Sequence, residues 1–67
     1  MTFKKTSLST WEAKKKDISY FIDLVYYFKS FKTYYLTITK GDEVIMNDIF
    51  FYKLNEVKQF AKQLKNI

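Results

Sequence analysis

The sequence predicts a small α+β fold made of a short N-terminal helix, a three-stranded antiparallel meander and a C-terminal amphipathic helix. A capping-box pattern precedes the first helix, alternating apolar residues indicate strands in the middle, and apolar spacings of three and four residues mark the end. The chain has 67 residues, which is enough for one domain. We assign that domain to residues 9–67, behind a polar arm at residues 1–8.

The first helix is expected to begin near Thr10. Ser9 stands three residues before Glu12, which is the spacing of a capping box, in which each side chain bonds a free backbone N–H of the first turn. Glu12 is also one helical turn from Lys16, so the two side chains can pair on the helix surface.

Residues 18–28 allow two interpretations. As a strand, every even position from Ile18 to Phe28 is apolar, and the residue types Ile, Tyr, Phe and Val are typical of sheets. As a helix, Ile18, Phe21 and Val25 lie on one stripe. No turn residue separates this segment from the first helix, so the second interpretation merges the two into one long helix. The predicted fold uses the strand, and the alternative architecture is α-β-β-α.

A β-hairpin is predicted next. Residues 33–39 alternate threonine with larger apolar residues, and Gly41 lies in a turn where it can adopt a positive φ. The return strand is expected over Glu43 to Tyr52, with a bulge at Asn47-Asp48. A three-residue loop at 40–42 would place Ile38 opposite Val44 and Leu36 opposite Met46.

The last segment, from Leu54 to Asn66, is predicted to be an amphipathic helix. Leu54, Val57, Ala61 and Leu64 follow one another at spacings of three, four and three, which places them on one face. The opposite face carries a row of lysines.

The composition excludes most catalytic chemistry. The chain has no Cys and no His, and it has a single Gly. Thiolate nucleophiles, imidazole acid–base catalysis, the usual zinc sites and glycine-rich phosphate loops are therefore absent from the sequence. The carboxylates are not spaced to form a close pair, and a chain of this size does not easily provide a pocket. We expect no enzymatic activity, no metal and no cofactor.

No membrane or export segment is evident in the sequence. The residues after Lys4 and Lys5 are polar where a signal peptide needs an apolar core. The longest apolar run, from Ile18 to Phe28, is interrupted by Asp23 and is about half the length of a membrane span. We expect a cytoplasmic protein without a membrane partner.

The charge of the chain predicts an anionic partner. Twelve lysines and no arginine face seven acidic residues, for a net charge of +5, and the excess lies in residues 1–16 and 53–67. We predict binding to nucleic acid, DNA or RNA, or to an anionic protein surface. Without arginine, base recognition is expected to be modest. The alternative is that Lys58, Lys62 and Lys65 form only the solvent-exposed face of an ordinary helix, without a binding role. The lysines predicted to contact phosphates are Lys14, Lys15, Lys16, Lys58, Lys62 and Lys65.

The aromatic content leads to a second hypothesis. The seven Phe, six Tyr and one Trp are more than a small core comfortably holds, because each ring would bury about 150–250 Å². Some rings are therefore expected at the surface, as a partner interface or in a homodimer. The residues predicted for this interface are Tyr26, Tyr27, Phe50 and Tyr52.

The corresponding function is that of a small inhibitor. Residue types encoded by AT-rich codons dominate the chain, and such reading frames are common in phages and other mobile elements. The alternative to nucleic-acid binding is therefore a phage- or mobile-element-type inhibitor that binds a host or defence protein, as anti-CRISPR proteins do. It would use exposed aromatic residues and a strand edge for this purpose.

Overall fold

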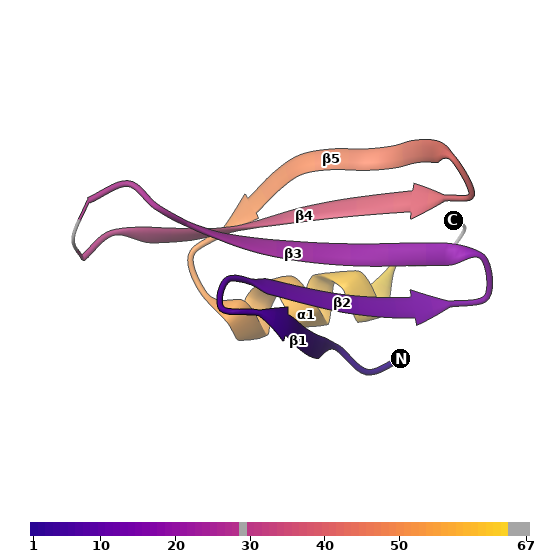
Figure 1. The fold of residues 1–67 in the computed structure, drawn as a ribbon, viewed down its shortest axis with the longest axis horizontal. Helices are drawn as coiled ribbons and strands as arrows, with labels where there is room; N and C mark the ends of the chain where they lie inside the picture. The colour runs from indigo at the N-terminus through magenta and orange to yellow at the C-terminus, as the bar shows by residue number, and fades with distance from the viewer. Residues whose placement is uncertain (29, 65–67) are drawn as a thin grey trace.

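The computed structural model describes residues 1–28 and 30–64. These residues form a single antiparallel sheet of five strands, with one helix lying across one face (Figure 1). Each strand pairs with the next in the chain, so the sheet is a meander with β1 and β5 at its edges. The elements are β1 (Lys4–Ser7), β2 (Thr10–Lys15), β3 (Ile18–Tyr26), β4 (Lys32–Lys40), β5 (Glu43–Phe51) and α1 (Leu54–Gln63).

The predicted N-terminal helix is wrong, and so are the three-stranded meander and the α-β-β-α alternative. The segment that begins at Thr10 is strand β2, paired with β3 along its whole length, and residues of the expected polar arm form β1. In a strand, Trp11 and Ala13 face the same side and reach the core, while Glu12 faces the other. Cross-strand pairing and burial of these side chains outweigh the capping-box signal.

The turn between β2 and β3 explains why this hairpin was missed. Lys15 pairs directly with Ile18, so Lys16 and Asp17 alone reverse the chain. Lys16 adopts a φ of 59°, a left-handed conformation that glycine or asparagine occupies more readily than lysine. The sequence therefore contains a two-residue turn without the residue types that normally indicate one.

The strand interpretation of residues 18–28 is confirmed for Ile18–Tyr26, which form β3, and the β4–β5 hairpin and the bulge are confirmed as well. The predicted register is wrong, because Gly41 and Asp42 form a two-residue turn, with Gly41 at φ 60°. The pairing is interrupted opposite Thr37, where β5 bulges at Asn47-Asp48 with Asp48 at φ 60°. A second shift leaves Ile45 as an extra residue between the Thr39–Val44 and Ile38–Met46 pairs. Ile38 therefore faces Met46, and beyond the bulge at Asn47-Asp48 Leu36 faces Ile49.

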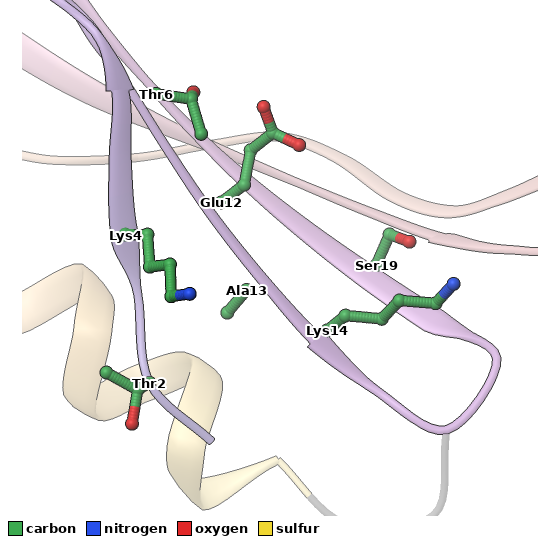
Figure 2. A pocket seen from close by; sticks show the side chains of 7 residues that line it. All are labelled: Thr2, Lys4, Thr6, Glu12, Ala13, Lys14 and Ser19. Carbon is green, nitrogen blue, oxygen red and sulfur yellow. The ribbon is translucent and has the colours of Figure 1, made fainter.

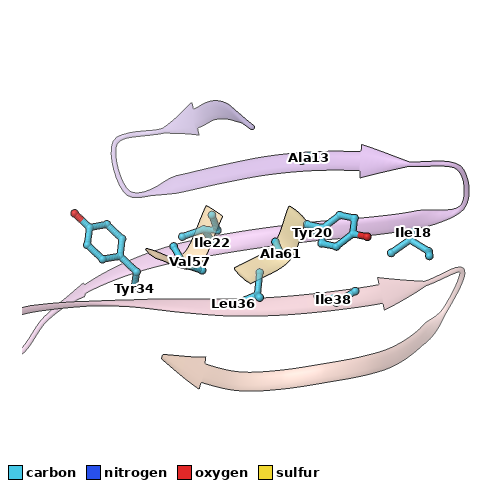
Figure 3. Close-up of a cluster of buried hydrophobic side chains, with 9 residues drawn as sticks. All are labelled: Ala13, Ile18, Tyr20, Ile22, Tyr34, Leu36, Ile38, Val57 and Ala61. Carbon is cyan, nitrogen blue, oxygen red and sulfur yellow. The ribbon is translucent and has the colours of Figure 1, made fainter. Parts of the chain in front are cut away.

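The core lies between α1 and the sheet. Ile22, Leu36 and Ile38 from the two central strands and Val57 from α1 are fully buried. Figure 3 shows Val57 and Ala61 of α1 over this part of the sheet. The amphipathic spacing predicted the helix and its buried face correctly, and the described helix ends at Gln63. Among the described residues, no helix is both long and apolar enough to cross a membrane.

Candidate binding surfaces

The two faces of the sheet differ in character because α1 covers only one of them. Side chains alternate between the faces along each strand, so the pairing register assigns each strand residue to a face. We call the side that carries α1 the helix side, and the opposite side the open face. Figure 1 shows β3 and β4 projecting beyond the other strands at one end of the sheet.

Positive charge is concentrated on the helix side. Lys5 stacks on the ring of Trp11, with its Nζ 5.4 Å from the ring centroid, and Trp11 borders the core. Lys32 and Lys40 pair with β3 residues on the core side of that strand. We call the lysines of the helix side the basic face, which consists of Lys5, Lys15, Lys32, Lys40, Lys58 and Lys62. Two carboxylate residues, Glu43 and Glu56, share this side.

Two of the predicted lysines meet on the basic face. Lys15 of β2 and Lys62 of α1 line one open depression of about 270 Å³ together with Met1, Tyr20 and Ala61. Tyr20 is only 3% exposed and forms part of the core, so this depression borders the core. The two lysines come from segments 47 positions apart in the sequence, and the fold brings them to one depression, where their positive charges favour an anion.

The other predicted lysines do not join this site. Lys14 lies on the open face, because consecutive strand residues point to opposite sides. Lys16 lies in the β2–β3 turn, and Lys58 is half-buried on α1. Lys65 lies outside the described residues. The run of three lysines at 14–16 is thus distributed over two faces and a turn instead of forming one patch.

A second depression, of about 370 Å³, lies along the first three strands. Figure 2 shows the side chains of β1, β2 and β3 that surround it, with Lys4, Glu12 and Lys14 as its charged members. Lys4 is not among the lysines predicted to contact phosphates, because the sequence indicates a polar arm at residues 1–8. Glu12, which is paired with Lys4, partly offsets the charge of the two lysines, so this depression is a weaker site for an anion than the one at Lys15 and Lys62.

Aromatic side chains form a connected cluster on the open face. Tyr35 of β4 and Phe50 of β5 are paired across the strands, with ring centroids 6.1 Å apart. From Phe50 the contacts continue to Tyr52, then to Phe31 and to Tyr27, with centroid distances of 5.8 to 6.1 Å. We call this cluster the aromatic patch, and it consists of Tyr27, Phe31, Tyr35, Phe50 and Tyr52.

The aromatic patch is ordered yet exposed. The backbone N–H of Tyr27 donates to the carbonyl of Phe31 at 2.9 Å, which closes the connection between β3 and β4. The hydroxyls of Tyr27 and Tyr35 are hydrogen-bonded, and this bond is the main cause that raises the pKa of Tyr35 above 10.0. Thr33, on the same side of β4, is only 2% exposed. Nevertheless Tyr27, Phe31, Phe50 and Tyr52 are each between 45% and 57% exposed.

Three of the four predicted interface residues belong to this patch. Tyr27, Phe50 and Tyr52 lie in it, whereas Tyr26 falls on the helix side of β3 by strand alternation and is also exposed. Tyr35 could be found from alternation along β4. Phe31 has no such signal, because it lies just before β4, and only the closed connection brings its ring to Tyr27.

The open face also carries negative charge near the rings. Asp23 pairs with Tyr35, and the charge of Asp48 contributes to the raised pKa of Tyr35. With Glu12, these three carboxylates oppose the two lysines of this face, Lys4 and Lys14. Within residues 1–28 and 30–64, no group of three His, Cys, Asp or Glu side chains is placed to hold a metal ion.

Comparisons with protein-family models, with curated proteins and with solved structures found no match for this chain.

Proposed function

We propose that the protein binds the phosphate backbone of nucleic acid through its basic face. The observation that carries the proposal is the meeting of Lys15 and Lys62 at one depression, on the side of the molecule where lysines greatly outnumber carboxylates. Lysine neutralises phosphates as a mobile point charge, and the chain has no arginine for bidentate base contacts. Binding is therefore governed by charge and by the shape of the nucleic acid, with little sequence preference.

The proposal is tested by the salt dependence of binding. Fluorescence anisotropy with a labelled 20-base-pair DNA duplex, and with single strands of DNA and RNA, measures affinity between about 50 and 200 mM salt. For a duplex, each phosphate contact contributes about 0.9 to the slope of log affinity against log salt, so four contacts predict a loss of roughly 100-fold over this range. No binding at 50 mM salt and micromolar protein would refute the proposal.

Two double variants with the same net charge test which face binds. Lys15→Gln/Lys62→Gln removes two charges from the basic face, and Lys4→Gln/Lys14→Gln removes two from the open face. The first variant is expected to reduce the salt slope by about 1.8, whereas the second leaves it nearly unchanged. Equal losses in both variants would show that only net charge matters, and that the basic face is not the binding site.

The aromatic patch supports a second candidate function, that of an inhibitor which binds a protein. Half-exposed rings in mutual contact are the side chains that most often carry interface energy. A pull-down from nuclease-treated lysate separates this function from the first. The inhibitor function predicts a stoichiometric protein partner that remains bound after nuclease treatment. This partner is lost from the Phe50→Ser variant and retained by the Lys15→Gln/Lys62→Gln variant. Loss of every partner after nuclease treatment would count against it.

A further inference from the structure

The aromatic patch exposes a large apolar area for a molecule of this size. Four of its rings are about half exposed, which leaves on the order of 300–500 Å² of aromatic surface in water. That value is as large as the largest apolar patch on a typical monomer, and such patches are often functional.

The charge distribution indicates which partner can cover this surface. Nucleic acid is disfavoured, because Asp23 and Asp48 lie beside Tyr35 and would face the phosphates of any strand stacked on the rings. A second copy of this chain is different. Two molecules of charge +5 repel each other through their basic faces, and they can approach most closely through their open faces, where carboxylates balance the lysines.

The size of the open face also fits a second copy. The molecule measures 36 × 20 × 20 Å, so one sheet face has a footprint of roughly 700 Å². A stable protein–protein interface buries about 800 Å² per partner, which the patch alone does not reach but the whole face approaches. Phe21 and Thr37, which are paired at the middle of the face and half-buried, continue the contact surface beyond the rings.

Pairing of two copies through a strand edge is less favourable than packing through the open face. The edge of β5 is interrupted by the bulge at Asn47-Asp48, with Asp48 in a left-handed conformation. Bulges of this kind prevent a strand from extending a neighbouring sheet. At the other edge β1 is only four residues long, and its pairing with β2 is itself irregular. Face-to-face packing therefore offers a second copy more contact than edge pairing does.

We propose that the protein is a homodimer in which the open faces of two copies pack against each other, with the aromatic patch as the main contact. The two sheets then form a sandwich, with the two α1 helices and the two basic faces on the outside. This proposal is independent of the nucleic-acid proposal, because it concerns the opposite face of the sheet.

Sedimentation equilibrium at 5–500 μM protein and about 300 mM salt tests the dimer, because this salt concentration screens the repulsion between the copies. The expected mass is twice 8.2 kDa at the upper concentrations. Phe50→Ser and Tyr52→Ser are each expected to weaken the dimer by roughly tenfold or more. Leu8→Ser is the control, because Leu8 is 91% exposed in the β1–β2 turn and is not part of the aromatic patch, and this change is expected to leave the mass unchanged.

Circular dichroism confirms that each variant is folded before its mass is measured. A mass of 8.2 kDa at every concentration would refute the dimer and would leave the patch for a different partner. A dimer that persists equally in Phe50→Ser and Tyr52→Ser would also refute it, because the contact would then lie elsewhere on the surface.

Discussion

The turn at Gly41 allows a backbone effect to be measured without interference from packing. Gly41 has a φ of 60°, and no atom lies within 4 Å of the position that an alanine Cβ would occupy. Gly41→Ala therefore costs only the left-handed penalty, about 1–2 kcal/mol, of which about 0.4–1 kcal/mol is returned by restriction of the unfolded chain. The expected net loss is roughly 0.5–1.5 kcal/mol, or about 3–10 °C in Tm for a domain of this size.

Thermal unfolding followed by circular dichroism measures this loss. Asp42→Ala is the matched control, because Asp42 lies in the same exposed turn without a positive φ, and its Tm is expected to change by only a few degrees. Gly41→Asn is expected to fall between glycine and alanine, since asparagine adopts the left-handed region more easily. A Tm for Gly41→Ala within 1 °C of the wild type would refute the two-residue turn with a left-handed glycine.

Three further predictions follow from the same structure. Lys16 has a φ of 59° without being glycine, so Lys16→Gly is expected to raise the Tm by a few degrees in the same assay, and a fall in Tm would contradict the turn. Val57→Ala removes two fully buried methyl groups between α1 and the sheet, and it is expected to lower the unfolding free energy in urea by roughly 1.5–2.5 kcal/mol. The exposed control Gln63→Ala is expected to change it by less than about 0.5 kcal/mol, and equal effects would mean that α1 does not stabilise the sheet. The hydroxyl hydrogen bond to Tyr27 raises the pKa of Tyr35, so the folded state holds this proton more tightly. The resulting stability is present below about pH 10 and is lost as the pH rises through the raised pKa. Tyr27→Phe is expected to move the Tyr35 titration back toward 10.0, measured by NMR of ring-labelled tyrosine, and an unchanged titration would show that the two hydroxyls do not interact.

The sequence predicted those elements whose signal is local. Residues 33–39 alternate threonine with larger residues except at Tyr35, Gly41 supplies the expected left-handed turn residue, and the apolar stripe through Val57 and Ala61 matches the buried face of α1. The β4–β5 register was not predictable in this way. It depends on the turn length and on the two register shifts of β5, at Ile45 and at Asn47-Asp48, and these are fixed by which side chains reach the core.

The N-terminal hairpin could not be predicted from local signals, because those signals point to a helix. Ser9 and Glu12 have the spacing of a capping box, and Lys16 adopts its left-handed conformation without being glycine or asparagine. What stabilises β2 is its pairing with β3 and the contact of Trp11 with Tyr34, whose ring centroids are 5.9 Å apart. That contact joins residues 23 positions apart, and sequence patterns carry no information about it.

The wrong prediction of a helix beginning near Thr10 also affected the predicted binding sites. On a helix, Lys14, Lys15 and Lys16 would share a broad surface, whereas on strand β2 and its turn they separate. The meeting of Lys15 with Lys62 requires both the strand and the packing of α1. The aromatic patch was predicted better, because the excess of rings over core volume follows from composition and does not depend on the assignment of elements.

The separation of a basic face from an aromatic face follows from the small amount of helix in the chain. A ten-residue helix is about 15 Å long, whereas strands of nine residues extend to about 30 Å. Helix α1 therefore covers part of one face, and no other helix among the described residues can cover the rest. The rings of Tyr35 and Phe50 pack against each other instead of under a second layer, and they reach only partial burial. The lysines of the basic face lie on the side of the sheet that α1 covers. A chain of this length thus leaves an aromatic face uncovered as a consequence of its fold, and this uncovered face is what a second copy would complete.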